Sequence, residues 1–550
     1  MLILTVKIGF VKVPSVRSYF LKFWKRERRR KTMAKTYVVA IDDGTQTLTA
    51  VLLDLDGQLI VQGDCDVPLF KGDRGERTQR PTDWRIALQT AMAKVLKAAG
   101  DAGIELGQCL GICPSAQMHG LGMLLADGHW VEDVMLWCDE RNDPEARELT
   151  EAFGCWIPRR LTIARWLWAI RNQPKLARQC SLIMPPSGVI ASFLDPTIRQ
   201  LGLGEARGLF PIDPATGQYD SRLAAIFDQM VSGHGVRPIL ELLPEPVMVG
   251  TVVGGLSKAG AELTGLPAGT PIISPEGDQP AVLAGTFVAK PGIASFSVGT
   301  SICANLLSQE QFRGLHPGVE PFMTADGLPF LMVHVENGTS YANTFIKKLF
   351  GDLLGRCVNP FTVLLSEAAR APINCGGVVI LPFANAEHGV GLASGACPAM
   401  FNLTDENATP GNVVRAALMA PMLTVRHSMD AIRAQGIPLN EIVLSGGIVK
   451  NNADWFAQMT ADIFQVPVRM TGVAEEASAM GAGLMALYGY RRAQDAALTW
   501  PRFLNEMRPN DDRVFKPQPE NAPVYDRMFA AYERLVERVE PELLNVDWEK

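Results

Sequence analysis

The sequence has no strong excess of charge of either sign. Its 550 residues hold 52 lysines and arginines against 58 aspartates and glutamates, which gives a net charge of -6 at pH 7. Binding to nucleic acid usually needs a basic face, so no nucleic-acid partner is expected. A nucleotide is a different case, because a local turn rather than the overall charge holds it.

The sequence also lacks the patterns that mark zinc sites and membrane spans. Its ten cysteines include no Cys-x-x-Cys pair, and neither they nor the seven histidines recur at the spacing of zinc ligands. Scattered free thiols are typical of a reducing compartment, so we expect a cytoplasmic protein. After residue 32 no apolar run is long enough to span a bilayer, and no membrane partner is expected.

The first 32 residues differ from the rest of the chain. Residues 1–32 are basic and aromatic, and they end in a mostly basic run at 25–31. A secretory signal would place its charges before its apolar stretch, which is the reverse of the order here. We expect Met33 to be the native start and this basic extension to lie outside the fold, with a membrane-surface anchor as the alternative.

Length and composition predict two large domains. A chain of 550 residues exceeds what one core usually organises, and 47% of its residues are hydrophobic. The chain is therefore expected to be globular rather than disordered. A homodimer is compatible with this length and composition.

The start of the folded chain predicts three antiparallel strands. Apolar runs at 37–41, 48–55 and 58–67 carry a hairpin signal, Asp56-Gly57, between the second and the third. A helix is predicted over 81–99, with Thr82 or Asp83 as its cap. Residues 107–113 then predict a buried strand.

A similar order returns in the second half. Residues 292–298 and 302–307 predict strands on either side of a turn, 412–435 a long helix, and 441–444 a short strand. We expect two related α/β units, each a mixed sheet with helices on its faces, joined near residues 280–290. A nucleotide would lie in the cleft between them.

Two Gly-Thr turns follow predicted strands and suit the binding of phosphates. At Gly44-Thr45 and Gly299-Thr300, a missing Cβ lets backbone N–H groups approach an anion, and the hydroxyl adds a donor. Asp42 precedes the first turn and is a hard oxygen ligand for Mg²⁺, which accompanies nucleotide triphosphates. Asp278, on a glycine-bearing loop, suits the removal of a proton from an alcohol, so the pattern predicts a kinase.

Several motifs, in their order along the chain, resemble those of the FGGY carbohydrate kinases. They are Asp42-x-Gly44-Thr45, Gln117-Met118-His119-Gly120, Trp137-Cys138-Asp139-Glu140-Arg141, Gly277-Asp278-Gln279, Gly299-Thr300-Ser301 and Ser445-Gly446-Gly447. Residues 162–168 are similar to the internal signature of that family, with Arg165 where lysine is usual. The resemblance covers roughly 37–490, and the motifs at 117–120 and 137–141 are most similar to those of xylulokinases and neighbouring ketose kinases.

The resemblance implies two actin-like (ribonuclease H-like) domains that close over a cleft, with ATP and Mg²⁺ as cosubstrates. Residues 36–286 would form the N-terminal domain that binds sugar and phosphate, 290–500 the C-terminal nucleotide-binding domain, and 501–550 a helical tail. The activity would be ATP-dependent phosphorylation of a ketose such as xylulose. The alternatives are a kinase for ribulose, a heptulose or a signalling polyol, and a non-catalytic actin-like ATP-binding regulator.

Some segments depart from the family pattern near the sugar pocket or the domain contacts, and they bear on substrate identity. They are Thr78-Gln79-Arg80-Pro81, Met184-Pro185-Pro186-Ser187, Ala384-Asn385-Ala386-Glu387-His388 and Met419-Ala420-Pro421.

The resemblance also suggests a role for each phosphate-site residue. Asp278 would be the general base, with an apolar setting that raises its proton affinity, and a helix N-cap is its structural alternative. Asp42 would hold Mg²⁺, and Asp43 is expected to be an exposed carboxylate in the turn. The expected phosphate and nucleotide contacts are Gly44, Thr45 and Gln46 from one lobe and Gly299, Thr300, Gly446, Gly447 and Asn451 from the other.

The acceptor would lie against Gln117, Met118 and His119. A buried methionine and a hydrogen-bonded core histidine are the structural alternative for this motif. Asp139 and Glu140 are weaker candidates, because pairing with Arg141 explains them equally well. Trp84 and Trp168 are expected to belong to the core.

Overall fold

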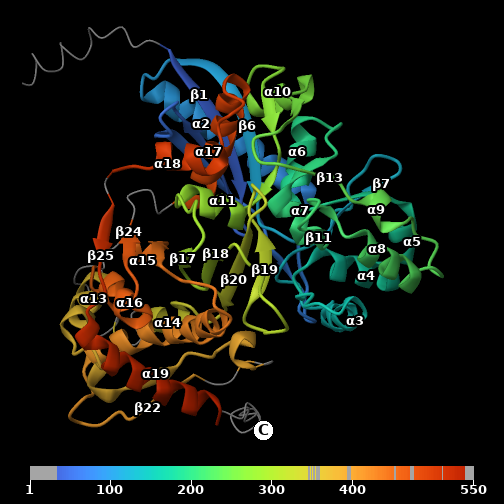
Figure 1. Ribbon diagram of the computed structural model, residues 1–550. Coiled ribbons are helices and arrows are strands. Elements are labelled where there is room, and N and C mark those ends of the chain that lie inside the picture. The colour runs from blue at the N-terminus through green and yellow to red at the C-terminus, as the bar shows by residue number, and fades with distance from the viewer. Residues whose placement is uncertain are drawn as a thin grey trace, which may run out of the picture.

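The computed structural model describes residues 34–344, 347–348, 350, 354, 360–392, 395, 398–450, 454–470, 476–510 and 512–538. The basic extension at 1–32 and Asn451 lie outside the described residues. Two α/β halves are stacked one above the other in Figure 1, each built around a mixed sheet of seven strands.

The first sheet opens with the three antiparallel strands that the sequence predicts. Strands β1, β2 and β3 pair in succession, and β6 then runs parallel to β1 on the other side. The order across the sheet is β14-β15-β6-β1-β2-β3, with the short β16 also paired to β6. The bounds are β1 (Lys35–Asp43), β2 (Thr47–Leu53), β3 (Leu59–Asp66), β6 (Leu106–Ala116), β14 (Val252–Gly255), β15 (Pro271–Ile273) and β16 (Glu276–Gly277).

The second sheet repeats this plan. Strands β17, β18 and β20 are antiparallel neighbours, and β23 and then β24 run parallel to β17. Both halves therefore have the ribonuclease H-like strand order, which confirms the two related units. The bounds are β17 (Ile293–Val298), β18 (Ile302–Leu307), β19 (Glu320–Met323), β20 (Pro329–Val335), β23 (Glu441–Ser445), β24 (Val468–Met470) and β25 (Arg513–Phe515).

A large insertion after β6 forms the right-hand side of the molecule in Figure 1. Its helices within 143–179 and 203–242 share a core with Phe322, Phe330 and Met332 of the second sheet, so the insertion bridges the two halves, whereas those at 186–194 and 258–264 belong to the core of the first sheet. Its main elements are β7 (Gly122–Leu125), β8 (Val134–Met135), α3 (Asp143–Phe153), α4 (Thr162–Asn172), α5 (Pro174–Gln179), β9 (Cys180–Met184), α6 (Pro186–Leu194), β10 (Gln200–Gly202), α7 (Leu203–Leu209), β11 (Ile212–Asp213), β12 (Gln218–Tyr219), α8 (Ser221–Met230), α9 (Ile239–Leu242), β13 (Glu245–Val247) and α10 (Lys258–Thr264).

The remaining elements cover the sheets or edge the halves. They are β4 (Phe70–Lys71), β5 (Arg77–Gln79), α2 (Pro81–Asp101), α11 (Asp278–Gly285), α12 (Ser340–Thr344), α13 (Pro360–Arg370), η2 (Cys375–Gly377), β21 (Val379–Leu381), η3 (His388–Val390), β22 (Ala399–Phe401), α14 (Pro410–Ala434), α15 (Gly447–Lys450), α16 (Asp454–Phe464), α17 (Ala477–Gln494), α18 (Trp500–Met507), η4 (Pro519–Asn521) and α19 (Ala522–Val536). Within the described residues, no helix is both long and apolar enough to cross a membrane.

The predicted cap of α2 is wrong. The helix begins at Pro81, its N-cap is Arg80, and no side chain caps it. Thr82 and Asp83 lie inside the first turn, because proline fixes its own backbone at the first helical position and sets the start one residue earlier.

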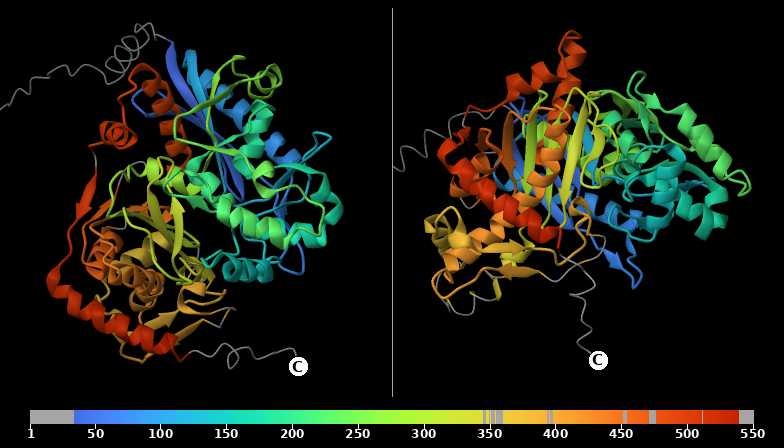
Figure 2. Two further views of the ribbon diagram at one scale, coloured as in Figure 1. Left: turned by 45° about the vertical axis from the view of Figure 1, so that its right-hand side comes forward. Right: turned by 60° about the horizontal axis from the view of Figure 1, so that its bottom comes forward.

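The chain does not run once through each domain. Between β24 and β25 of the second sheet, α17 and α18 return to the first half and share a core with β1 and β2, whereas α19 lies again at the bottom of the second half (Figures 1 and 2). The expected division at residue 500 therefore falls inside this returning segment, at the first residue of α18. Each helix therefore belongs to the half whose sheet it packs against, whatever its position along the chain.

Helices α11 and α17 cross so closely that side chains are excluded at the contact. A Cβ added at Gly481 would lie 1.8 Å from the carbonyl oxygen of Ala281, and one added at Gly285 would lie 1.9 Å from that of Ala477. Both helices share a core with the first sheet, and this crossing fixes them against each other.

We therefore expect Gly481→Ala to destabilise the protein by about 1 to 3 kcal/mol, because the methyl group overpacks the crossing. Gly100→Ala is the matched control, since a Cβ there meets nothing within 4 Å, and it should be neutral or stabilising by about 0.5 to 1 kcal/mol. Denaturant unfolding measures both variants. Equal stability of the two would contradict the close crossing.

Candidate active site

Three parallel strands end side by side and bring acidic residues together. Ser115 of β6 is the register partner of both Asp42 on β1 and Glu276 on β16. Helix α11 begins directly after β16 with Asp278. Segments that are far apart in the sequence thus meet at one edge of the first sheet.

Asp278 lies in the first turn of α11, whose N-cap is Gly277, so the N-cap alternative is wrong. Its carboxylate accepts hydrogen bonds from the backbone of Met118 and from Gln279. Burial, followed by the charge of Asp42, raises the pKa of Asp278 to about 7. The proton affinity is raised, as the apolar setting predicts, and the carboxylate can exchange a proton near neutral pH.

Asp42 is held by a residue from the far end of the chain. Its Oδ1 accepts a hydrogen bond of 2.8 Å from the hydroxyl of Ser478 on α17. Burial raises the pKa of Asp42, against hydrogen bonds from Ser478 and Ser115 that lower it. In the described part of the chain, no group of three or more His, Cys, Asp or Glu side chains is placed to hold a metal ion. A carboxylate such as Asp42 fits Mg²⁺, which keeps several waters or phosphate oxygens as its other ligands.

Asp43 is not the exposed turn carboxylate that the sequence predicts. Its side chain is fully buried, and neither carboxylate oxygen has a hydrogen-bond partner among the described residues. Burial and the charge of Asp42 raise the pKa of Asp43 well above its usual value. The prediction is wrong because β1 continues through Asp43, which places this side chain on the same face as Ile41.

The first Gly-Thr turn is tied into a hydrogen-bond network. Nε1 of Trp137 donates to Oγ1 of Thr45, and this hydroxyl donates to Oε1 of Gln117, each at 3.0 Å. Gln79 donates to the backbone oxygen of Thr45 at 2.8 Å and accepts from Gln117 at 2.7 Å. The Thr45 hydroxyl therefore already has both partners, and Gln46 is the exposed side chain of the turn.

Gln117 and Met118 are buried, with both ends of the Gln117 amide in that network. Met118 packs under the loop of Asp278, since a Cβ at Gly277 would meet its Cγ at 2.5 Å. This is the packing that the structural alternative describes.

His119 is also buried, and its backbone has a positive φ of 72°. Its Nδ1 lies 3.2 Å from the carbonyl oxygen of Gly208, and its ring packs on Phe322 with centroids 5.2 Å apart. Burial, and then the charge of Arg160, hold the pKa of His119 well below its usual value. The ring is thus neutral and donates from Nδ1 to Gly208, a tautomer that leaves Nε2 as an acceptor.

The second Gly-Thr turn connects β17 and β18 beside the end of β23. Thr300 is exposed, and the carbonyl oxygen of Gly299 accepts from the backbone and the hydroxyl of Thr339. Gly446 has a φ of 97°, and a Cβ there would lie 2.5 Å from the carbonyl oxygen of Val298. A Cβ at Gly447 would meet nothing within 4 Å, so the space in front of α15 is open.

The two halves meet beside Asp278. Nδ2 of Asn305 on β18 donates to Oε1 of Gln279 at 2.9 Å. Asn305 comes from the strand that follows the second Gly-Thr turn, so the second sheet directly contacts the residue after Asp278.

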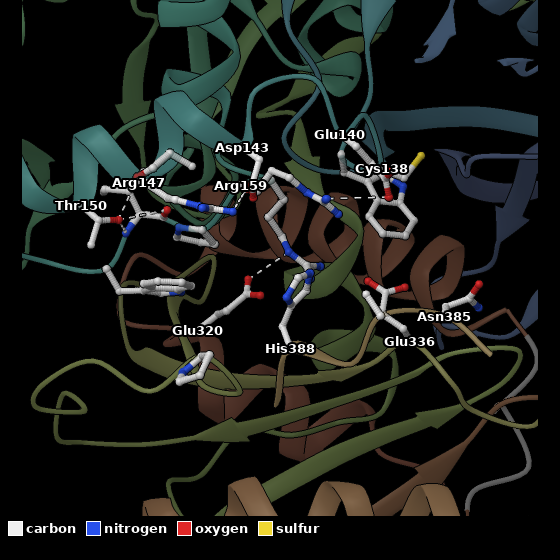
Figure 3. Close-up of a pocket in the computed structure, with 18 of the residues that line it drawn as sticks. Cys138, Glu140, Asp143, Arg147, Thr150, Arg159, Glu320, Glu336, Asn385 and His388 are labelled. Atoms are coloured by element: carbon white, nitrogen blue, oxygen red, sulfur yellow. Dashed lines mark hydrogen bonds and ion pairs between the residues drawn. The ribbon is translucent and has the colours of Figure 1, made fainter. Parts of the chain in front are cut away.

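A cleft of about 820 Å³ opens between the two halves. Its lining holds charges of both signs, and in Figure 3 arginines of the first half face acids of the second half, such as Glu320. Arg160 pairs with Glu320 at 3.0 Å, and Arg159 lies 3.7 Å from Glu140. The charged residues of the lining are Arg77, Glu140, Asp143, Arg147, Glu151, Arg159, Arg160, Glu320 and Glu336, with His388 beside them.

Two residues connect the cleft with Thr45 and Asp278 at the edge of the first sheet. Trp137 lines the cleft and donates to Thr45, and the charge of Asp278 acts on Arg160. Asp278 does not itself line this cleft.

Asp139 and Glu140 were weaker candidates for acceptor binding, with pairing to Arg141 as the alternative, and the structure separates them. Asp139 is fully buried and accepts from Arg141 at 2.7 Å, so the pairing explanation holds for it. Glu140 lines the cleft. Trp84 belongs to the core, and Trp168 packs at its margin under the guanidinium of Arg141.

Sequence reasoning missed several residues of this site. Trp137 and Gln79 lie in segments that were compared with the family motifs. Their indole and amide groups can form hydrogen bonds, and this could have indicated a role in the site. Arg160 and Ser478 carry no signal in the sequence, because only folding brings them to Asp278 and Asp42.

A pair of buried glutamates supports the loop of Asp278. Both carboxylate oxygens of Glu205 on α7 are buried and have no hydrogen-bond partner among the described residues. Oε1 of Glu276 accepts from the backbone N–H of Glu205 and, at 3.1 Å, from that of Gly277. Burial and the charges of Glu276 and Asp278 raise the pKa of Glu205, and burial raises that of Glu276 to about 7.

Two sequence models of one family match the chain. The model for the N-terminal domain of the FGGY family of carbohydrate kinases matches residues 37–285, and the model for its C-terminal domain matches residues 294–490.

Whole proteins are similar along nearly the full chain. A xylulose kinase from Bacillus subtilis (strain 168) is 22% identical over 507 residues, which cover 91% of this chain and 96% of that protein. An autoinducer-2 kinase from Klebsiella pneumoniae subsp. pneumoniae is 24% identical over 531 residues, which cover 90% and 93%. The crystal structure of xylulose kinase from Rhodospirillum rubrum has a TM-score of 0.76 at 22% identity, covers 92% of this chain and 99% of that chain, and shows the same fold.

The glutamate pair predicts a pH-dependent effect on stability. A carboxyl group whose folded pKa is raised stabilises the fold below its unfolded pKa, and that stability is lost as the pH rises. Glu205→Gln should therefore raise the free energy of unfolding at pH 8 by roughly 1 to 3 kcal/mol, because glutamine is neutral in both states and removes an acid whose charged form the fold disfavours. The gain should disappear near pH 4. Denaturant unfolding at both pH values measures it, with the exposed Glu262→Gln as control, and a loss of stability at pH 8 would contradict the account.

Proposed function

Because the chain belongs to the FGGY family of carbohydrate kinases and is a sugar phosphotransferase, we propose that it transfers the γ-phosphate of ATP to a hydroxyl of a ketose such as xylulose, with Asp278 as general base. The observation that carries this proposal is the meeting of β1, β6 and β16, which brings Asp42 and Asp278 together. Burial at this place, followed by the charge of Asp42, raises the pKa of Asp278 to about 7.

A general base works best when its pKa lies near the working pH. Asp278 would accept the proton of the sugar hydroxyl as the bond to phosphorus forms, and its place in the first turn of α11 fixes the carboxylate. ATP supplies the phosphoryl group, and Mg²⁺ neutralises its charge. Asp42 would hold Mg²⁺, directly or through water.

The phosphates would lie between the two Gly-Thr turns. Gly44, Gln46 and the backbone of Thr45 would contact them from the first half, with Thr45 oriented by Gln117. The second half would contribute Gly299 and Thr300 to the phosphates and Gly446, Gly447 and Asn451 to the adenosine.

The acceptor would enter through the cleft. Paired opposite charges such as Arg160 with Glu320 offer both donors and acceptors, which suits a neutral polyol better than an anion. His119 would offer Nε2 to a sugar hydroxyl from beside Met118 and Gln117. A ketose such as xylulose fits these groups, and ribulose, a heptulose or a signalling polyol are the alternatives.

Cytoplasmic action is part of the proposal, because all eight cysteines in the described part of the chain are free. A non-catalytic ATP-binding regulator would not need the raised pKa of Asp278.

The role of Asp278 is tested by Asp278→Asn, with the exposed Asp64→Asn as control. ADP release is measured over a panel of ketoses, aldoses and polyols. We expect kcat with the best acceptor to fall by about 10²- to 10⁴-fold in Asp278→Asn. In the parent, kcat/KM should rise with pH through about 7, since the base acts when deprotonated, and the variant should lose this rise. A variant as active as the parent would overturn the assignment.

The network at Thr45 gives a second test. Trp137→Phe removes the N–H that donates to Thr45 but keeps the ring, and it should lower kcat/KM for ATP by about 2- to 10-fold, the value of one hydrogen bond. Trp156→Phe is the control, because Trp156 lines the same cleft and its Nε1 has no partner among the described residues. Equal effects of the two changes would show that this hydrogen bond is not used.

A further inference from the structure

A cysteine, a histidine and a glutamate lie together on the second sheet at the cleft. Cys303 on β18 and His334 on β20 are direct partners across the two antiparallel strands. Glu336 follows β20 and lines the cleft, and its Oε1 lies 3.4 Å from Nδ1 of His334. Nucleophile, imidazole and orienting carboxylate therefore stand in the order that activates thiols in enzymes.

The ring of His334 is fixed by its surroundings. Only 4% of its side chain is exposed, and the ring of Trp137 packs edge-on against it at 5.9 Å between centroids. Nη2 of Arg160 lies 3.3 Å from the same Nδ1 that faces Glu336. One nitrogen cannot donate to Glu336 and accept from Arg160 at once, so the protonation state of the ring selects its partner.

The neighbouring charges favour the protonated ring. Burial would lower the pKa of His334, but the charge of Cys303 and hydrogen bonds with Cys303 and Glu336 raise it to about 10, against the charge of Arg160. Burial would raise the pKa of Glu336, but His334 and then Arg160 lower it to about 2. The protonated ring of His334, directly across the strand pair from Cys303, can therefore give a proton to the leaving oxygen of an oxidant that the sulfur attacks.

Cys303 is partly exposed and lies near Asp278. On β18 it shares a face with Asn305, two residues and about 7 Å along the strand, and Asn305 contacts Gln279 beside Asp278. Oδ1 of Asn305 is buried without a hydrogen-bond partner among the described residues, so it can accept from a new donor on this face. The other charged groups here are those that act on Arg160, namely Glu320, Glu336 and Asp278.

We propose that Cys303 is a modification site, at which a small hydroperoxide that enters the cleft oxidises the sulfur to a sulfenic acid and thereby stops phosphoryl transfer. The sulfur attacks the terminal peroxide oxygen, an S–O bond forms, and the O–O bond breaks. Sulfur gives up two electrons to the peroxide, and the leaving oxygen takes the His334 proton to become water or an alcohol. The stop of phosphoryl transfer rests on the proposed kinase function, whereas the oxidation does not.

The oxidation is tested on the full chain with hydrogen peroxide and dimedone, which traps sulfenic acids, followed by site-resolved mass spectrometry. Cys138 is an internal control, because it is half-buried like Cys303 and lines the cleft, but burial raises its pKa. We expect the adduct on Cys303 to form at least about tenfold faster than that on Cys138. His334→Gln should bring Cys303 down to the Cys138 rate and leave Cys138 unchanged, and Glu336→Gln should slow Cys303 if the first variant does not fold. Equal rates at the two cysteines, or no dependence on His334 and Glu336, would overturn the site.

The effect on phosphoryl transfer is measured as the ratio of treated to untreated activity. In the parent and in Cys138→Ser this ratio should fall about tenfold or more and recover with a thiol reductant. In Cys303→Ser it should stay near one. An adduct on Cys303 with an unchanged ratio would overturn the inhibition. A protein without any kinase activity would contradict the proposed function, and the adduct measurement would still decide the site.

Discussion

The close crossing of α11 and α17 is the contact on which the site depends. Gly285 and Gly481 let the two backbones touch, and each helix contributes at its first turn a group that the chemistry needs. Helix α11 begins with Asp278, and α17 carries Ser478, which holds Asp42. A change in this crossing would therefore move the proposed base and the proposed metal ligand together, although they are far apart in sequence.

The site also concentrates acids that are buried or half-buried. Asp43 and Glu205 are fully buried without hydrogen-bond partners among the described residues, and Glu276 and Asp278 have pKa values near 7. Such groups cost stability unless they are neutral. They share one physical cause, burial, and it is this cause that makes Asp278 able to exchange a proton at neutral pH. The burial that lets Asp278 exchange a proton near neutral pH thus also lowers the stability of the fold.

Much of the fold could be predicted because it depends on local patterns. Alternating apolar runs and the Asp56-Gly57 signal gave the hairpins, and the recurrence of the same element order gave the two related sheets. The close backbone approach at Gly446, at the end of a predicted strand, could also be predicted from the neighbouring residues, and so could the raised pKa of Asp278 in its apolar segment. Long-range contacts could not be predicted in this way. Ser478 reaches Asp42 over 436 residues, and Arg160 reaches the site from the insertion.

The errors of sequence reasoning arose at the ends of elements. Asp43 was placed in the turn because charged residues usually leave a strand, but β1 continues through it and buries it. The role of Thr45 at the phosphates stays a prediction, but its turn alone gave no sign that its hydroxyl is hydrogen-bonded to Gln117 and Trp137. In both cases the surrounding tertiary packing decided the environment of the side chain, and that packing is not encoded in the neighbouring residues.

The return of α17 and α18 to the first sheet affects how the protein can be synthesised. Val38, Val51 and Leu53 of the first sheet are covered by residues of these late helices. N-terminal domains commonly fold while the ribosome still makes the rest of the chain. Here α17 and α18 can cover this face of the first sheet only after residue 507 has emerged, so part of the apolar surface of the nascent protein stays exposed until then, and chaperones can bind it during that interval.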